Sequence, residues 1–155
     1  MPEDFCDNDR QTTPARYVFV YGTLRRGCSN DITRLSPPPR WVGDAELPGV
    51  LYTLGAYPGM RLEGHAAGDR PVRGEVYAIE PALERVLDGI EGLVFGAPPQ
   101  DDDEYAKREV SVSVAGQSLS CVMYEVHPRF ALSAARLVNG DWCERDDLLI
   151  SHCEN

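Results

Sequence analysis

The spacing of apolar and polar positions changes several times along this chain, and most of the spacings predict β-strands. Residues 17–21 form an unbroken run of β-branched and aromatic side chains, which is typical of a buried strand. After Ala106 the pattern becomes strict alternation with valine at every second position, which predicts one arm of a hairpin that turns at 115–117. Four further runs are interpreted as strands or strand arms: 41–46, 50–54, Val72–Ile79 and 119–126.

One segment has helical spacing instead. Its apolar positions recur at i, i+3, i+4 and i+7, as Leu83, Val86, Leu87 and Ile90. Pro81 suits the first turn of a helix, and Gly92 marks the expected end. We therefore expect one amphipathic helix between the strand runs.

Glycine and proline separate these segments. Tyr57-Pro58-Gly59 is interpreted as a turn, and Gly74 as a bulge or a point of close backbone approach within its strand. Residues 1–15 are polar and acidic, and we expect them to form a flexible tail. At 155 residues, the chain has the length of one domain, which we place at 16–155.

The strand at 17–21 runs into a loop bracketed by Gly22 and Gly27. Glycine permits sharp turns and close approach, so the backbone amides between the two could face an anion or a carbonyl oxygen. The loop is thus a candidate cradle for a small polar ligand. The plainer alternative is a tight connection to a following helix.

Composition narrows the choice of partners. The formal net charge is −10, so the average field repels nucleic acid and anionic lipid. No apolar run approaches the roughly 20 residues needed to span a bilayer. The 5 cysteines are odd in number and form no CxxC pair, so we expect reduced thiols and a cytoplasmic protein without a metal site.

Few residues are candidates for a catalytic nucleophile or a metal ligand. None of the 3 histidines lies in a nucleophile or metal motif, and Cys28 could act as a nucleophile only if a histidine reached it; an inert thiol is the plainer interpretation. The acidic run 101–104 could be imagined as a cation site but lacks spaced ligands, so a solvated loop is preferred.

Glu91 is a stronger candidate, because it falls at the edge of the helix's apolar face, one residue before Gly92. Burial and the negative end of the helix dipole both raise the pKa of such a carboxyl, towards that of a usable general base. A merely solvated helix-end glutamate is the alternative, and Glu84 and Asp88 compete on similar geometry.

Several motifs together resemble the γ-glutamylcyclotransferase-like family, which includes γ-glutamylamine cyclotransferases and plant avirulence-induced proteins. The resemblance rests on 20–27 (VYGTLRRG) with Asn30, on 57–59 (YPG), 74–77 (GEVY), 87–92 (LDGIEG), Tyr105 and 140–142 (GDW). It covers about residues 17–142. The fold it implies is α+β, a small β-barrel of mixed parallel and antiparallel strands flanked by short helices.

The resemblance also implies a reaction. Glu91 would be the acid/base residue that lets the α-amine of a γ-glutamyl substrate attack its own γ-carbonyl, releasing 5-oxoproline and an amine without a cofactor, metal or protein nucleophile. The substrate-binding residues would be Tyr21, Gly22, Thr23, Leu24, Tyr105 and Tyr124. Two alternatives remain open: a binding module without catalysis, and cyclising deprotection of a γ-glutamylated natural product. A homodimer is also left open.

Three basic residues are candidates for either substrate contact or structural charge: Arg25, Lys107 and Arg108. Relatives commonly show Tyr-x-Arg-x-x-Val, but ungapped spacing from Tyr105 places Lys107 in the arginine's position. Lysine cannot make the planar bidentate contact of arginine. Either Lys107 substitutes for it, or a bulge brings Arg108 into place. The long loop at 93–104 could be a lid.

Overall fold

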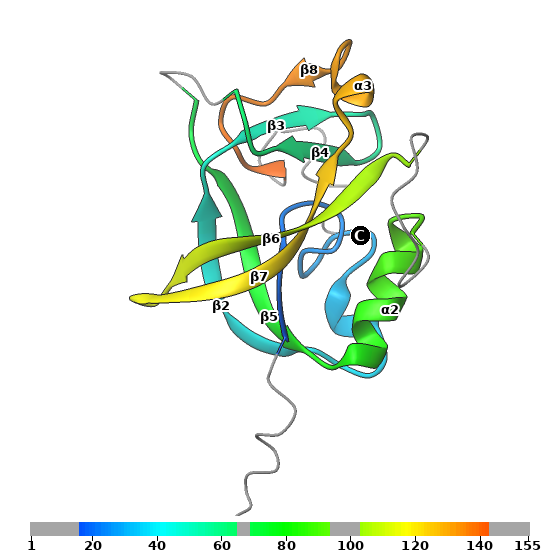
Figure 1. Ribbon diagram of the computed structural model, residues 1–155, viewed down its shortest axis with the longest axis vertical. Helices are drawn as coiled ribbons and strands as arrows, with labels where there is room; N and C mark the ends of the chain where they lie inside the picture. The colour runs from blue at the N-terminus through cyan, green and yellow to red at the C-terminus, as the bar shows by residue number, and fades with distance from the viewer. Residues whose placement is uncertain (1–15, 65–68, 94–102, 143–155) are drawn as a thin grey trace, which may run out of the picture.

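A curled mixed sheet dominates the part of the chain that the computed structural model describes, residues 16–64, 69–93 and 103–142 (Figure 1). Its eight described strands are β1 (Arg16–Val20), β2 (Arg40–Leu47), β3 (Val50–Thr53), β4 (Pro58–Arg61), β5 (Val72–Ile79), β6 (Tyr105–Val114), β7 (Gln117–Val126) and β8 (Ala135–Arg136). The described helices are α2 (Pro81–Ile90), α3 (Pro128–Ala131) and a 3₁₀ turn, η1 (Ile32–Arg34). The expected α+β class is confirmed.

Strand β1 lies in the middle of the sheet and carries the loop at 22–31. The strand order is β2-β5-β1-β7-β4-β3-β8, with β6 paired to the other strand of its hairpin, β7. β1 is antiparallel to β5 and parallel to β7, and β4 is also parallel to β7. The mixture of parallel and antiparallel pairs in a curled sheet is the small barrel that the resemblance implied.

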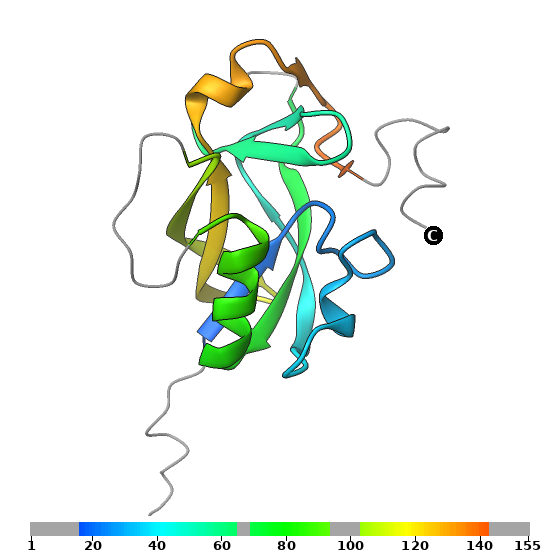
Figure 2. The same ribbon diagram turned by 90° about the vertical axis from the view of Figure 1, so that its right-hand side faces the viewer.

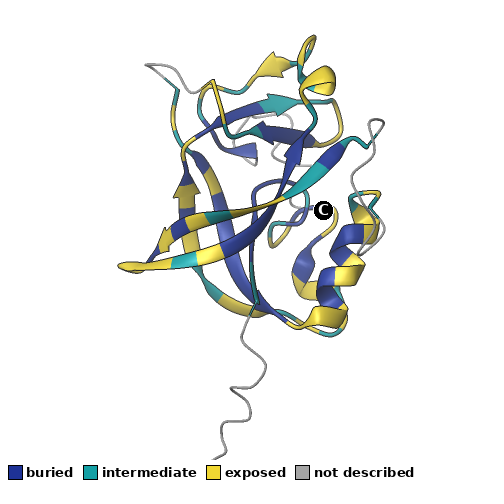
Figure 3. Ribbon diagram, in the orientation of Figure 1, coloured by how far each residue is buried: buried dark blue, intermediate teal, exposed yellow. Residues whose placement is uncertain are grey.

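Two apolar cores pack against the two faces of this sheet. Figure 3 colours the ribbon by how far each residue is buried. The core inside the curl contains Phe19, Tyr21, Met60 and Trp142, among others. The second core lies between the sheet and α2 and contains Val18, Leu87, Tyr105 and Tyr124. Figure 2 shows α2 lying along the sheet beside the loop that follows β1. Because β1 alternates between these faces, it ends where both cores meet that loop.

The hairpin of β6 and β7 keeps one register throughout, from Tyr105 opposite Val126 to Val114 opposite Gln117. Its turn is the two residues Ala115 and Gly116, both with positive φ (50° and 83°). Positive φ at both positions is the geometry of a tight type I′ hairpin turn. The alternation after Ala106 therefore predicted the hairpin, with the turn one residue shorter than expected.

One local expectation needs correction, and one of the two alternatives for Gly74 is confirmed. Tyr57-Pro58-Gly59 is not a free turn, because Pro58 begins β4; a first strand position suits proline, which lacks an amide hydrogen. Gly74 is a point of close approach, since a Cβ there would lie 2.4 Å from the Val20 carbonyl oxygen. The bulge lies instead in the neighbouring β2, between Trp41 and Gly43.

Helix α2 has the expected bounds but a different buried face. Val86 and Ile90 are 37% and 40% exposed, whereas Glu84 and Asp88 are 4% and 1% exposed. Two acids can occupy a buried helix face only when cations reach them. The sheet supplies those cations, as described below, and the spacing of apolar residues alone could not indicate them.

Candidate active site

A cavity of about 300 Å³ opens where the loop after β1, the start of β4, the end of α2 and the β6–β7 hairpin meet. Its lining residues are Phe19, Val20, Tyr21, Gly22, Thr23, Leu24, Asn30, Tyr57, Pro58, Ile90, Glu91, Glu104, Tyr105 and Tyr124. All seven residues expected to bind substrate or act in catalysis thus line one cavity. The charged residues among the lining are two glutamates, and none of the lining residues is basic.

In the loop after β1, the backbone carbonyl groups of residues 22–24 accept hydrogen bonds from within the protein, whereas two backbone amides remain available to a ligand. The carbonyls of Gly22, Thr23 and Leu24 accept hydrogen bonds from the amides of Arg25, Asn30 and Ile32, at 3.0, 2.8 and 2.9 Å. Within the described residues, the amides of Thr23 and Leu24 have no protein acceptor. Those two N–H groups are suited to bind a carboxylate or a carbonyl oxygen of a ligand.

The ring of Pro58 leaves no room for a side chain at Gly22. A Cβ at this position would lie 2.5 Å from Cγ and 2.9 Å from Cδ of Pro58. The proline ring is rigid and begins β4, so it cannot yield as a flexible side chain would. The loop and β4 can approach each other this closely only with glycine here.

Arg25 holds the loop from outside the cavity. Its guanidinium donates to Asp141 at 2.7 Å and to Glu75 at 3.4 Å, and all three side chains are at most 14% exposed. The amide of Arg26 also donates to Glu75, at 2.9 Å. Of the two roles expected for Arg25, the geometry supports the structural one.

Four tyrosines line the cavity, and the three that we expected to bind substrate, Tyr21, Tyr105 and Tyr124, donate hydrogen bonds from their hydroxyl groups to neighbouring elements. Tyr21 donates to the carbonyl of Tyr124 at 2.6 Å and accepts from the amide of Met60 at 3.1 Å. Tyr105 donates to the carbonyl of Pro58 at 2.8 Å. Burial raises the pKa of all three phenols well above the usual range, so they stay protonated.

Glu91 lies at the C-terminal end of α2 and is partly buried beside the cavity. Its backbone amide still donates to the carbonyl of Leu87, at 3.0 Å, so the helix geometry fixes its position. Burial, and secondly the charge of Glu104, raise the pKa of Glu91 to about 7. The expected direction is confirmed, with a neighbouring carboxylate as the second cause.

The two competing acids of α2 are engaged elsewhere. Hydrogen bonds from Arg16 lower the pKa of Glu84, which also accepts from Lys107. Asp88 accepts from Tyr124 at 2.6 Å and from Lys107 at 2.9 Å. Of the three acids, the cavity lining includes only Glu91.

Glu104 was not singled out by sequence, because it ends an acidic run that we interpreted as a solvated loop. Residues 101 and 102 of that run lie outside the described residues. Glu104, however, lines the cavity, and the hydroxyl of Tyr57 donates to its carboxylate at 2.9 Å. Glu104 is half-buried and belongs to the site, which the interpretation as a solvated loop did not predict. Its position directly before Tyr105 was the available signal.

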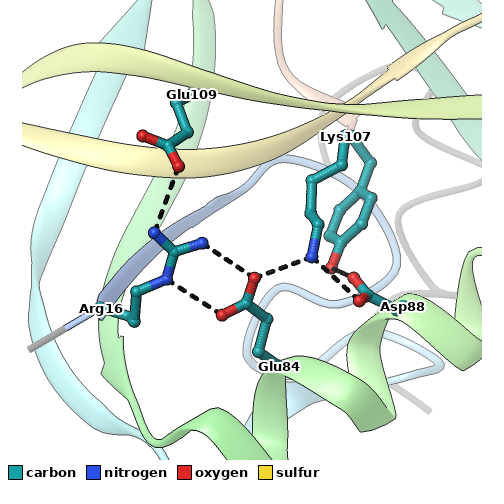
Figure 4. Close-up of polar contacts among 6 residues, drawn as sticks. Arg16, Glu84, Asp88, Lys107 and Glu109 are labelled. Carbon is teal, nitrogen blue, oxygen red and sulfur yellow. Dashed lines mark hydrogen bonds and ion pairs between the residues drawn. The ribbon is translucent and has the colours of Figure 1, made fainter. Parts of the chain in front are cut away.

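Lys107 and Arg108 point to opposite faces of the hairpin, and neither lines the cavity. The continuous register of β6 and β7 leaves no bulge, so Lys107 keeps the position that relatives give to arginine. Its ammonium contacts Glu84 and Asp88 on α2, as Figure 4 shows. Arg108 donates to Glu125 at 3.0 Å. Both have the structural role that we considered.

The remaining sequence candidates do not reach the cavity. Cys28 is 1% exposed in the core inside the curl, so it is a buried thiol rather than a nucleophile at the site. Among the described residues, no cluster of three or more histidine, cysteine or acidic side chains could hold a metal ion. None of their helices is long and apolar enough to cross a bilayer.

Comparison with known proteins agrees with the motifs. Residues 18–144 match the family described as "Gamma-glutamyl cyclotransferase, AIG2-like". The chain belongs to this family. The γ-glutamylcyclotransferase family protein YtfP of Escherichia coli K12 is 30% identical over 136 residues, covering 83% of this chain and 97% of YtfP. A Vibrio cholerae protein with a γ-glutamylcyclotransferase name is 33% identical over 128 residues, covering 83% and 96%.

Solved structures show the same fold. The crystal structure of an AIG2-like protein from Mus musculus superposes with a TM-score of 0.62 at 22% identity, covering 86% of this chain and 92% of the mouse chain. A structure named γ-glutamyl cyclotransferase gives a TM-score of 0.51 at 17% identity, covering 73% and 67%. The family is one of enzymes, and cyclotransferase activity is the general activity that membership supports.

Proposed function

We propose that this protein releases 5-oxoproline and a free amine from γ-glutamyl substrates, with Glu91 as the general acid and base. The observation that carries the proposal is the position of Glu91. Its carboxyl has a pKa of about 7 and lines the same cavity as the open amides of Thr23 and Leu24. A base with this pKa is about half ionised at neutral pH, where proton transfer in both directions is efficient.

The reaction needs little beyond positioning and one proton carrier. The loop amides would hold the glutamyl group so that its α-amine faces its γ-carbonyl carbon. The nitrogen attacks that carbon and passes a proton to Glu91; the bond between the γ-carbon and the leaving nitrogen then breaks as Glu91 returns the proton to that nitrogen. Holding reacting groups in an attack geometry can contribute roughly 7–11 kcal/mol to an intramolecular reaction.

The test is a panel of γ-glutamyl amines and γ-glutamyl amino acids with detection of 5-oxoproline. Glu91→Gln should lower kcat by at least about a hundredfold, because it keeps the shape of the side chain and removes its proton affinity. Glu63→Gln, an exposed change outside the cavity lining, is the matched control. Full activity in Glu91→Gln would refute the role of Glu91.

Glu104 favours one subclass of substrate, in which the leaving amine carries a further positive charge. Its carboxylate lies at the cavity, and no lining residue is basic. An amine with a second ammonium group would gain an ion pair there that a neutral amine lacks. γ-Glutamyl-1,5-diaminopentane and the uncharged γ-glutamylpentylamine form a matched pair of substrates for this comparison. Equal kcat/KM for both would exclude the preference.

The alternative without catalysis gives a different result in the same panel. A binding module would take up 5-oxoproline or a γ-glutamyl compound without turnover, whatever its charge. Isothermal titration with 5-oxoproline alongside the activity panel separates the two functions. Binding without any release of 5-oxoproline would overturn the proposed reaction and leave the site assignment intact.

A further inference from the structure

A row of charged contacts joins α2 to the sheet next to the cavity, and Figure 4 shows it. Arg16 of β1 donates twice to Glu84, at 3.0 and 2.9 Å. Lys107 of β6 donates to Glu84 at 2.8 Å and to Asp88 at 2.9 Å. The hydroxyl of Tyr124, from β7, donates to Asp88 at 2.6 Å. Glu84 and Asp88, on one face of α2, thus accept hydrogen bonds from two cationic side chains and one phenol, which come from three strands.

The contacts lie at different distances from Glu91 along the helix. At a rise of about 1.5 Å per residue, Asp88 precedes Glu91 by roughly 4.5 Å and Glu84 precedes it by roughly 10.5 Å. Lys107 is therefore the cation that holds the last turn of α2, whereas Arg16 holds the first. Tyr124, the other partner of Asp88, also lines the cavity.

We propose that Lys107 is a positioning residue for the proposed reaction: through Asp88 it fixes the last turn of α2 and the ring of Tyr124, and so the place of the Glu91 carboxylate in the cavity. The inference rests on the proposed function of Glu91. Lys107 itself does not line the cavity and acts through Asp88. A charged contact fixes helix register more sharply than apolar packing, because its partners must meet within hydrogen-bond distance.

Loss of Lys107 would affect the two acids unequally. Glu84 would keep both hydrogen bonds from Arg16, whereas Asp88, 1% exposed, would keep Tyr124 but lose its ammonium partner. A buried carboxylate without a cation is unfavourable, so the last turn of α2 would shift towards solvent. The first turn would stay in place.

The test compares Lys107→Met with Arg16→Met, which removes a cation of the same network from the other end of the helix. We expect kcat for 5-oxoproline release to fall about ten- to a hundredfold in Lys107→Met, since a displacement of about 1 Å can have an effect of this size. The Kd for 5-oxoproline should change by a smaller factor than kcat, because the loop after β1, which supplies the open amides, is untouched. Arg16→Met should keep its kcat while losing stability.

Lys107→Arg should recover most of the lost kcat, because its charge still reaches Asp88. If Lys107→Met does not fold, the double variant Lys107→Met with Asp88→Asn carries no unpaired buried charge. It still lacks the charged contact that fixes the last turn, so its kcat should remain below that of the wild type, with a smaller loss than an unpaired Asp88 would cause. The inference is overturned if a folded variant without Lys107 keeps wild-type kcat, or if Arg16→Met lowers kcat equally.

A measurement without substrate separates this inference from the proposed reaction. Carbon-detected NMR titration of the Glu91 carboxyl should give a pKa of about 7 in the wild type and in Arg16→Met. In Lys107→Met it should move down towards its ordinary range, because a displaced carboxylate loses the burial that raises it. An unchanged pKa in Lys107→Met would refute the positioning role; absence of 5-oxoproline release in the wild type would refute only the reaction.

Discussion

Replacing Glu91 by glutamine should make the protein more stable at alkaline pH while it removes activity. The carboxyl has a pKa of about 7 in the folded protein against an ordinary value of 4.5. A raised pKa means that the folded state holds this proton more tightly than the unfolded chain does. The stability linked to this group is therefore fully present below pH 4.5 and is lost as the pH rises through 7.

The size of the effect follows from the two pKa values. A difference of one pH unit between the folded and unfolded pKa corresponds to about 1.36 kcal/mol, so the ionised carboxylate lowers the free energy of unfolding by up to about 3 kcal/mol. Between about pH 5 and pH 8, linkage gives a change of up to about 2.5 kcal/mol from this one group. Glutamine cannot ionise, so the advantage of Glu91→Gln over the wild type should grow by that amount over the same interval.

Urea unfolding at pH 5 and pH 8 measures this difference directly. Wild type, Glu91→Gln and the exposed control Glu63→Gln should be compared at equal ionic strength, because the chain carries a net charge of −10. The control removes one negative charge without removing the buried one. A stability advantage of Glu91→Gln that is the same at both pH values would refute a raised pKa at Glu91, whatever the enzyme assays show.

Three further predictions concern the surroundings of the site. Glu104→Gln should move the acid limb of the kcat/KM profile to lower pH, because the charge of Glu104 contributes to the raised pKa of Glu91. Arg25→Met should lower the free energy of unfolding by about 3 kcal/mol, because two buried carboxylates, Glu75 and Asp141, each lose a short contact to its guanidinium. Arg73→Met, at a half-exposed position, should lower it by under about 1 kcal/mol, and urea denaturation distinguishes the two variants. Gly22→Ala should lower stability by about 1–3 kcal/mol and weaken 5-oxoproline binding in calorimetry, because its Cβ meets a proline ring.

The sequence predicted those elements whose residues carry a regular period. The alternation after Ala106 and the run Val72–Ile79 each gave a strand with nearly correct ends, and Gly92, with φ of 82°, ended α2 as expected. These patterns are local, so no distant contact is needed to interpret them. The Glu91 position and the direction of its pKa followed from the same helix geometry.

Contacts between distant segments account for the features that the sequence did not predict. Glu84 is buried because Arg16, 68 residues earlier, donates to it. Pro58 belongs to a strand because β4 pairs antiparallel with β3 and parallel with β7. Glu104 joins the site because the fold brings it to Tyr57. For Glu84 and Pro58, the local composition favoured exposure or a turn, and a partner elsewhere in the chain reversed that preference. For Glu104, a distant partner places a half-exposed side chain at the cavity.

The distribution of charge around the cavity links the stability of the fold to the proposed chemistry. Arg25, Lys107 and Arg108 all lie near the site, but each is engaged by carboxylates outside the cavity lining. Their charges therefore do little to offset Glu91 and Glu104. A cation at the cavity would lower the pKa of Glu91 and leave it a weak base. Pairing the cations outside the cavity thus stabilises the framework and, under the proposed mechanism, keeps the proton affinity of Glu91 high enough to take a proton from an amine.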